Sequence, residues 1–423
     1  MIRLSFGCLG ALLLLFLVSP SHAATITHLS YGAHGSAWHD YLGVMKEAFE
    51  QAYPGHRVEI LIEPDPVEKF AVMLGAGVSP DILDFSTGQA APFIPDGNFL
   101  DLRPWIERDS DVSLSDFPTP VIEGLTAPDG SLIGLPVSVY PITTWYNLDF
   151  LNEAGLASPA ELGSDWTWDV LAEYGRKLTQ DRDGDGQNEV WGIDRIRSRP
   201  YIQVVQAGGF YFDREMLPTQ SRLLSEPVLS ALEYLRGIVV VDKTSQGLDV
   251  PNVAQTYMWH GRSAINVVDG PGAIPFYEGA PFEWDVWLQP TGPDNNATAV
   301  FVTSFQISSH TQAPDVAWEW VKFITAREEA QQTFARITGR IPILSSVTRD
   351  LDQFVSPLPS NWHIFLEQTL HPKNVGGYGV VPDTRVTQTL NSYLNAIWRD
   401  EMPVRTAMQR AHDEISAFFA ERR

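Results

Sequence analysis

The sequence predicts an α/β protein built as two lobes. Strand-like and helix-like segments alternate along the chain, which is typical of parallel βαβ units. The chain has 423 residues, of which 44% are hydrophobic, so it can form more than one core. Its 30 prolines are scattered as turn residues, so we expect no flexible tether between the lobes.

Residues 1–23 have the features of a secretory signal peptide. Arg3 precedes an apolar run over 9–18, and a small-residue cleavage site ends at Ala23. The run is too short to span a bilayer as a helix, which takes about 20 residues. We therefore expect cleavage near Ala23 and a periplasmic location. The only cysteine, Cys8, lies in this segment, so the mature chain has no thiol chemistry and no disulfide.

Helical spacing of apolar residues and strand-like alternation define the remaining elements. In chain order, we expect a strand over 26–31, a helix over 38–53, a strand over 57–62, a helix over 69–76 and a strand over 81–85. Later, the same patterns predict strands near 133–140, 263–268 and 284–288, and helices over 167–178, 227–240 and 313–325. Residues from 362 onward are mostly helical by pattern.

Charge and aromatic content narrow the ligand classes. With 29 Lys+Arg against 52 Asp+Glu, the net charge is −23, which repels phosphate backbones and excludes nucleic acid. Aromatic residues make up 11% of the chain and supply flat surfaces for stacking. The ligand classes that remain are a neutral or cationic small ligand, a sugar polymer, a protein partner, and an anion held by a local basic pocket.

Ligands of open α/β sheets bind beyond the carboxyl ends of strands. The loops in such positions contain glycine, aromatic and hydrogen-bonding residues, the composition that sugar faces and hydroxyls require. These loops are 31–38, 85–89, 139–141, 199–201 and 268–272. They contain the candidate ligand-binding residues His34, Trp38, Gln89, Tyr140, Arg199, Tyr201, Asp269 and Gly270.

Arg195, Arg197 and Arg199 occupy alternate positions. An extended backbone would direct these guanidinium groups to one side. If that side is the binding cleft, they would favour an anionic solute such as a uronate or a sugar phosphate. Alternatively, they form a solvated basic stripe, partly neutralised by Asp194 and Glu189.

Asp181, Asp183 and Asp185 reproduce the first half of an EF-hand loop, with Gly186 at position six. Position twelve is Gly192, where calcium loops have a bidentate glutamate. We therefore expect a tight turn closed by Asp side chains. A weak calcium site is the alternative, and we expect no other cofactor.

Motifs along essentially the whole mature chain carry a resemblance to a known family. In order, they are Lys46-Glu47-Ala48-Phe49-Glu50, Tyr53-Pro54-Gly55, Gly77-Val78-Ser79-Pro80-Asp81-Ile82, Gly134-Leu135-Pro136-Val137, Trp145-Tyr146-Asn147-Leu148-Asp149-Phe150-Leu151, Thr167-Trp168-Asp169 and Gly339-Arg340-Ile341-Pro342. In this order and spacing they resemble the periplasmic solute-binding proteins of sugar ABC transporters, the group that includes maltose-binding protein.

The resemblance implies the two-lobe periplasmic-binding-protein fold of type II, with a ligand cleft at a hinge that closes on binding. The lobes would be discontinuous: residues 24–136 plus 304–341 form the N-terminal lobe, and 137–303 plus 342–423 the C-terminal lobe. It also implies a monomer that captures a mono- or oligosaccharide, delivers it to the permease subunits of an ABC transporter, and performs no chemistry.

Within the resemblance, Tyr140 takes the position of a sugar-contacting glutamate, and Tyr201 that of a stacking aromatic. Gly272 stands where the family usually has a tryptophan, so a stacking plane is missing there. Asp269 could bind two hydroxyls or cap its own turn. Either tyrosine could instead be a core residue with a satisfied hydroxyl.

Other candidates also have structural alternatives. Trp38 could pack at the start of its helix, and a lone histidine such as His34 is more often structural. The rival function from another class is a secreted glycoside hydrolase, which needs two carboxylates facing each other across a bond. The sequence has no histidine-based metal spacing, Gly-x-Ser-x-Gly elbow or P-loop.

Overall fold

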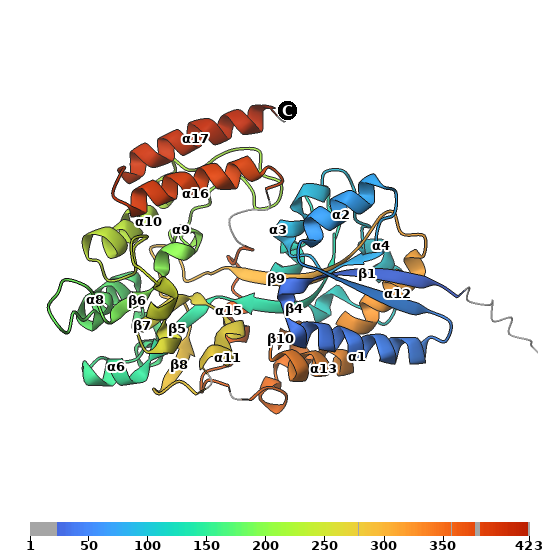
Figure 1. Ribbon diagram of the computed structural model, residues 1–423, viewed down its shortest axis with the longest axis horizontal. Coiled ribbons are helices and arrows are strands. Elements are labelled where there is room, and N and C mark those ends of the chain that lie inside the picture. Colours follow the sequence, from blue (N-terminus) through green and yellow to red (C-terminus); the bar gives the residue numbers. More distant parts are fainter. Residues whose placement is uncertain (1–22, 278, 357, 377–380, 422–423) are drawn as a thin grey trace, which may run out of the picture.

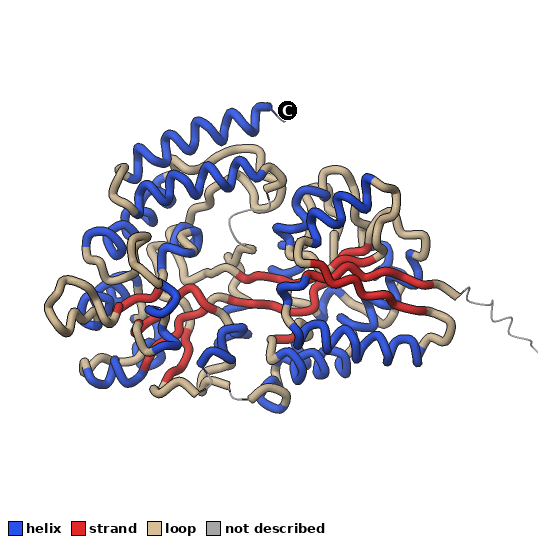
Figure 2. Tube along the Cα trace, viewed as in Figure 1, coloured by secondary structure: helices blue, strands red, loops and turns tan. Residues whose placement is uncertain are grey.

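The computed structural model describes residues 23–277, 279–356, 358–376 and 381–421. It has two lobes, each built on its own sheet, as Figure 1 and Figure 2 show. The α/β fold class expected from the sequence is confirmed. The predicted signal peptide lies outside the described residues except for Ala23, and none of the described helices is long and apolar enough to cross a bilayer.

The first lobe contains a six-stranded sheet of order β10-β4-β9-β3-β1-β2. Its strands are β1 (Thr25–Tyr31), β2 (Arg57–Glu63), β3 (Ile82–Leu83), β4 (Leu135–Pro141), β9 (Val300–Ile307) and β10 (Ile341–Pro342). β1 pairs in parallel with β2 and β3, whereas β9 runs antiparallel to both β3 and β4. The βαβ start of the chain therefore continues into a mixed sheet.

Helices cover this sheet because each buries an apolar stripe against it. In α1 (Ser36–Ala52), the buried residues Trp38, Tyr41, Leu42, Met45 and Phe49 recur at helical spacing. The other helices of the lobe are α2 (Pro66–Gly75), α3 (Thr87–Ala90), α4 (Arg103–Arg108), α5 (Thr119–Gly124), α12 (Pro314–Thr325), α13 (Glu328–Thr338) and α14 (Ser345–Thr348).

The second lobe contains a four-stranded sheet of order β6-β7-β5-β8. Its strands are β5 (Thr143–Asn147), β6 (Trp191–Asp194), β7 (Ser263–Asp269) and β8 (Trp284–Trp287). Its helices are α6 (Leu148–Glu153), α7 (Pro159–Leu162), α8 (Trp168–Leu178), α9 (Tyr201–Gln206), α10 (Glu226–Arg236), α11 (Ile274–Tyr277), α15 (Ile364–Thr369), α16 (Thr384–Trp398) and α17 (Val404–Glu421). The predicted helix over 227–240 is α10 followed by one π-helical turn over Gly237–Val241.

The chain crosses between the sheets where β4 ends and β5 begins, and it returns between β8 and β9. β4 and β9 pair with each other from Leu135↔Phe305 to Pro141↔Val300. The predicted lobe limits at 136 and 304 thus fall inside these two strands, because the pairing keeps both strands in the first sheet. These crossing strands form the floor between the lobes (Figure 1).

Candidate functional site

Two aromatic side chains lie next to each other on the crossing strands. Tyr140 of β4 pairs with Phe301 of β9 in the sheet, and their ring centroids are 6.4 Å apart. Directly paired residues of two antiparallel strands point to the same face. Both rings therefore lie on one face of the floor, at the junction of the two lobes.

The ring of Tyr140 lies against the loop that follows β7. A Cβ atom on Gly270 would lie 2.6 Å from Cε1 of Tyr140, and a Cβ atom on Gly272 would lie 2.5 Å from its Cε2. Only glycine permits this approach. Burial, followed by the charge of Asp269, raises the pKa of Tyr140, so its hydroxyl keeps its proton at neutral pH. It can then both donate and accept hydrogen bonds.

Arg199 reaches the same place from the second lobe. Its Cζ lies 4.7 Å from the ring centroid of Phe301, and its Nη1 donates to the hydroxyl of Tyr201 at 3.5 Å. Tyr201 is only 4% exposed at the start of α9, so its ring packs in the core instead of offering a face for stacking. Arg199 and Tyr140 thus both lie beside Phe301.

The expectation that the arginines share one side of an extended strand is wrong. Arg195 has a left-handed backbone conformation (φ 46°), and residues Ile196–Ser198 form a 3-10 turn. Arg197 donates to the carbonyl oxygens of Gln246 at 2.9 Å and Gly247 at 3.0 Å. Only Arg199 among the three arginines therefore contacts the floor of the site.

Arg195 is enclosed by partners that the sequence analysis only partly anticipated. It contacts Asp269 at 2.5 Å and Asp194 at 3.1 Å. Its Cζ lies 4.0 Å from the ring centroid of Tyr257 and 5.0 Å from that of Trp259. Asp269 therefore binds Arg195, a role that differs from both expectations for this residue. Nothing in the local pattern marked Tyr257 or Trp259 as partners.

A second buried carboxylate organises the first lobe. Asp84 follows β3 and accepts hydrogen bonds from Ser30 Oγ at 2.5 Å, Tyr31 N at 2.8 Å and Trp38 Nε1 at 2.9 Å. Burial alone would raise the pKa of Asp84, but the hydrogen bond and charge of His34, with other donors, hold it below its ordinary value. The sequence signal for Asp84 was a charged residue inside an apolar strand.

Asp84 decides the roles of two predicted site residues. Trp38 is 0% exposed, so the expectation that its ring contacts a ligand is corrected: in this structure it is a core residue bound to Asp84. His34 is partly exposed in the 3-10 turn Gly32–His34, and its Nε2 lies 3.2 Å from the main-chain oxygen of Asp84. His34 therefore remains at the edge of the site.

Arg340 is a site residue that the sequence analysis did not select. Its Nη2 donates to the main-chain oxygen of His34 at 2.9 Å, and its Cζ lies 5.4 Å from the centroid of Trp38. Burial lowers the pKa of Arg340, although the neighbouring Tyr140 and Asp84 act in the opposite direction. Its position just before β10 brings a cation from the first lobe towards Tyr140.

Gln89 caps a helix. Its Oε1 accepts from the backbone nitrogen of Ser86 at 3.0 Å, while the Ser86 hydroxyl accepts from the backbone nitrogen of Gln89 at 3.4 Å. This capping box fixes the start of α3. Gln89 stays partly exposed, so ligand contact there remains a prediction.

The predicted loop turn is present, and it gathers one more carboxylate. Asp181 accepts hydrogen bonds from the backbone nitrogens of Gly184 at 2.7 Å and Gly186 at 2.9 Å. Carboxylate oxygens of Asp181, Asp183, Asp185 and Glu189 lie within 4.8 Å of one another. Oxygen ligands of this kind suit calcium, so a calcium site stays a prediction.

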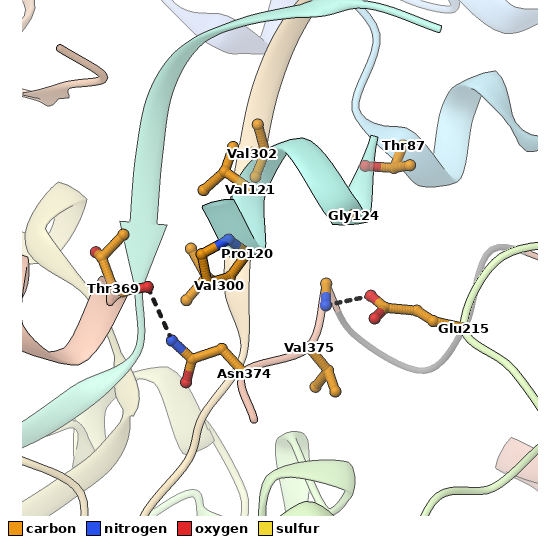
Figure 3. A pocket seen from close by; sticks show the side chains of 11 residues that line it. Thr87, Pro120, Val121, Gly124, Glu215, Val300, Val302, Thr369, Asn374 and Val375 are labelled. Atoms are coloured by element: carbon orange, nitrogen blue, oxygen red, sulfur yellow. Dashed lines mark hydrogen bonds between the residues drawn. The ribbon is translucent and has the colours of Figure 1, made fainter. Parts of the chain in front are cut away.

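A pocket lies on the opposite face of the crossing strands. Val300 and Val302 of β9 alternate with Phe301 and line this pocket together with α5 and residues 374–376 (Figure 3). Glu215 also lines it and accepts a hydrogen bond from the backbone nitrogen of Gly376. Burial raises the pKa of Glu215 to about 7.

Comparison with known proteins identifies the relatives of this chain. A family model described as bacterial extracellular solute-binding protein matches residues 45–362. The arabinooligosaccharide-binding protein of Halalkalibacterium halodurans is 24% identical over 323 residues, which cover 70% of this chain and 66% of that protein, just under two thirds of its length.

Solved structures show the same fold. An ABC substrate-binding protein of Listeria monocytogenes in complex with cycloalternan superposes with a TM-score of 0.77 at 21% identity, covering 94% of this chain and 99% of that one. The sugar-binding protein MalE of Xanthomonas citri gives a TM-score of 0.76 at 19% identity, covering 94% and 98% of the two chains.

Proposed function

Because the chain belongs to the bacterial extracellular solute-binding family, we propose that it captures a carbohydrate between its lobes and delivers it to the permease of an ABC transporter. The observation that carries the proposal is the position of Tyr140. Its ring lies on the floor, where the charge of Arg199 of the second lobe acts on its hydroxyl and its hydroxyl in turn acts on Arg340 of the first lobe. A solute in contact with all three would bind both lobes at once.

Such contacts are what hinge closure requires. A solute shifts an equilibrium between open and closed forms only if it binds the closed form more tightly. Groups contributed by both lobes supply that difference, because they surround the solute only after closure. The hydroxyl of Tyr140 and the donors of Arg199 suit sugar hydroxyls, and the ring of Phe301 suits a sugar face.

A carbohydrate is also the ligand class named for the relatives. One is named for arabino-oligosaccharides, and another was solved with cycloalternan. The net charge of −23 opposes anionic solutes at long range. The anionic alternative now depends on Arg199 and Arg340, because Arg195 is neutralised by Asp194 and Asp269.

We propose capture without chemistry. A glycoside hydrolase needs two carboxylates on opposite sides of the bond that is cleaved. The carboxylates described above are enclosed by the protein: Asp84 and Asp194 are fully buried, and Asp269 is nearly so. Each of these carboxylates already accepts hydrogen bonds from protein donors. This arrangement supports a binding role.

The mature protein with a panel of arabino- and malto-oligosaccharides tests the proposal. We expect stoichiometric heat in calorimetry, a higher melting temperature, and recovery of the sugar uncut. A decrease in the radius of gyration by X-ray scattering should accompany binding. Release of reducing ends, or no uptake of any glycan, would contradict the proposal. Fractionation of the producing cells tests export to the periplasm.

A further inference from the structure

Two aromatic side chains stack on each other at the surface of the second lobe. The ring centroids of Trp259 and Phe276 are 5.1 Å apart, and the two ring planes differ by 24°. Phe276 belongs to α11 and is 60% exposed, whereas Trp259 is half-buried. Since Trp259 covers one face of the Phe276 ring, the exposed area of that ring falls on its other face and its edges. These two residues, here called the aromatic pair, therefore present a flat apolar surface to solvent.

The aromatic pair is close to residues 270–272, which pack on the Tyr140 ring and are here called the Tyr140 loop. Gly272 lies in the 3-10 turn Pro271–Ala273, and α11 follows this turn directly. Phe276 is four residues after Gly272, which corresponds to a rise of about 6–8 Å along helical backbone. A few linked sugar rings are long enough to span this step.

The helix α11 lies at the junction of the two lobes. Its buried residues Ile274 and Tyr277 belong to the same apolar cluster as Val139 of β4 and Ile341 of β10. Figure 1 shows α11 beside the crossing strands, on the side of the second lobe towards β10. Because successive residues of a helix point in different directions, the exposed Phe276 projects away from that cluster. The aromatic pair thus stands at the edge of the candidate site, on its second-lobe side.

One cation supports both the aromatic pair and the Tyr140 loop. The Cζ of Arg195 lies 5.0 Å from the ring centroid of Trp259, and its Nη2 contacts Asp269, which ends β7 just before the loop. Trp259 Nε1 donates to His260 Nε2 at 3.1 Å, which holds the indole ring in one orientation. All of these residues belong to the second lobe, so a hinge motion leaves the spacing between the loop and the aromatic pair unchanged.

The surface of the aromatic pair suits a neutral sugar ring. A sugar ring has an apolar face of C–H groups, and a flat aromatic ring binds such a face by stacking. Arg195, the cation beneath the pair, is already paired with Asp194 and Asp269, so this surface offers little attraction to an anion. An exposed apolar surface at the edge of a binding site is typical of a ligand contact.

We propose that the aromatic pair is an outer subsite, which stacks on one ring of an oligosaccharide while another ring of the same chain contacts Tyr140. This inference rests on the proposed capture function and narrows the solute to an oligosaccharide. A monosaccharide held at Tyr140 does not reach Phe276, so the outer contact adds affinity only for longer chains. We therefore expect affinity to rise with chain length until the chain spans both contacts.

Calorimetry with a chain-length series of arabino- or malto-oligosaccharides tests the outer subsite. We expect Phe276→Ala to raise Kd about tenfold for the longest sugar that binds and less than about twofold for the shortest. Since Phe276 is exposed, the melting temperature of the free variant should stay close to that of the wild type. A Kd that is raised equally for short and long chains, or unchanged for both, would overturn the proposal.

Further variants serve as controls. Phe210→Ala removes another exposed phenylalanine of the second lobe, which follows the end of α9, whereas Arg199 precedes its start. It should leave Kd unchanged at every chain length. Phe276→Trp should keep the affinity for long chains, and Phe276→Leu should lose most of it, because leucine has no flat face. Equal Kd values for Phe276→Trp and Phe276→Leu would contradict stacking.

Fluorine NMR detects the contact directly. In protein labelled with fluorophenylalanine, the resonance that is missing from Phe276→Leu belongs to residue 276. A long oligosaccharide at saturation should shift this resonance, and the shortest sugar that binds should leave it in place. Heat of binding without a shift would overturn the outer subsite and leave the capture proposal intact. No uptake of any glycan would contradict both, so the two failures are distinguishable.

Discussion

The ring of Tyr140 occupies the space beside Gly272, where a Cβ atom would lie 2.5 Å from its Cε2. By the resemblance, maltose-binding protein has a glutamate at the position of Tyr140, and the family usually has a tryptophan at the position of Gly272. Here the strand carries the aromatic ring and the loop carries the glycine. The two residues are sterically coupled, because the Tyr140 ring fills the space that a side chain at position 272 would need.

This coupling predicts the effect of Gly272→Ala. The added methyl group must displace the Tyr140 ring, so we expect the free energy of unfolding to fall by about 1–3 kcal/mol. In a Tyr140→Ala background the same substitution should cost much less. Urea unfolding of the four proteins in this double-mutant cycle measures the difference.

Gly88→Ala serves as the control, because a Cβ atom there has no heavy atom within 4 Å. It should leave stability nearly unchanged in either background. An equal cost of Gly272→Ala with and without the tyrosine ring would refute the coupling.

His28 predicts how stability depends on pH. It is fully buried, and its Nδ1 accepts from Trp320 Nε1 at 3.3 Å. Burial lowers its pKa from 6.5 to about 4; Asp84 acts against this shift, and the charges of His34 and His39 add to it. Between pH 4 and pH 6.5 the unfolded chain binds more protons than the folded chain. The free energy of unfolding therefore decreases as the pH falls from 6.5 to 4.

His28→Asn tests this dependence. The asparagine oxygen can accept from Trp320 without titrating, so the variant should lose part of the decline in stability across that pH window, about 3 kcal/mol at most. His260→Asn, at an exposed position, is the control. Chemical denaturation at several pH values gives the slopes. Parallel slopes for wild type and His28→Asn would exclude His28 as the cause.

Elements such as α1 and β1 were predictable because their signals are local, whereas β5, β6 and β9 were not predicted. Residues of α1 repeat at helical spacing, since one face of the helix must be buried. The extended interpretation of 195–199 failed for the opposite reason. The left-handed conformation of Arg195 accompanies contacts to Asp269 and Gln246, which lie far away along the chain. Alternate spacing alone carries no information on such contacts.

The sequence predicted which loops form the candidate site better than it predicted which side chains contact each other there. The strand-end rule selected the segments that contain His34, Tyr140 and Arg199, because parallel strands end at a common edge. Arg340 was missed since its partner His34 is 306 residues earlier in the sequence. Trp38 is a core residue because it is fully buried. The identity of one residue in a sequence does not show whether its side chain is in the core.

The acidic loop predicts the result of metal removal. The oxygens of Asp181 already accept two backbone N–H groups, and Gln187 N donates to Asp185 at 2.8 Å. These bonds hold the turn without a cation. We therefore expect a chelator to leave the melting temperature unchanged. A lower melting temperature in chelator, restored by calcium and abolished by Asp183→Asn, would instead establish the calcium site.

The substitution Arg199→Ala distinguishes a neutral solute from an anionic one. A neutral sugar would lose one hydrogen-bonding partner in Arg199→Ala, so we expect Kd to rise about 3- to 10-fold. The Kd for a neutral sugar should change little between about 50 mM and about 500 mM salt, because screening does not affect uncharged solutes. Calorimetry with the best oligosaccharide of the panel measures both effects.

Arg197→Ala is the matched control, because Arg197 donates to the carbonyl oxygens of Gln246 and Gly247 instead of facing Phe301. It should leave Kd unchanged. If Arg199→Ala weakens the affinity by more than about 100-fold, and if Kd rises steeply with salt, the solute is anionic. That result would assign the charge recognition to Arg199 and Arg340, since Arg195 is already paired with two carboxylates.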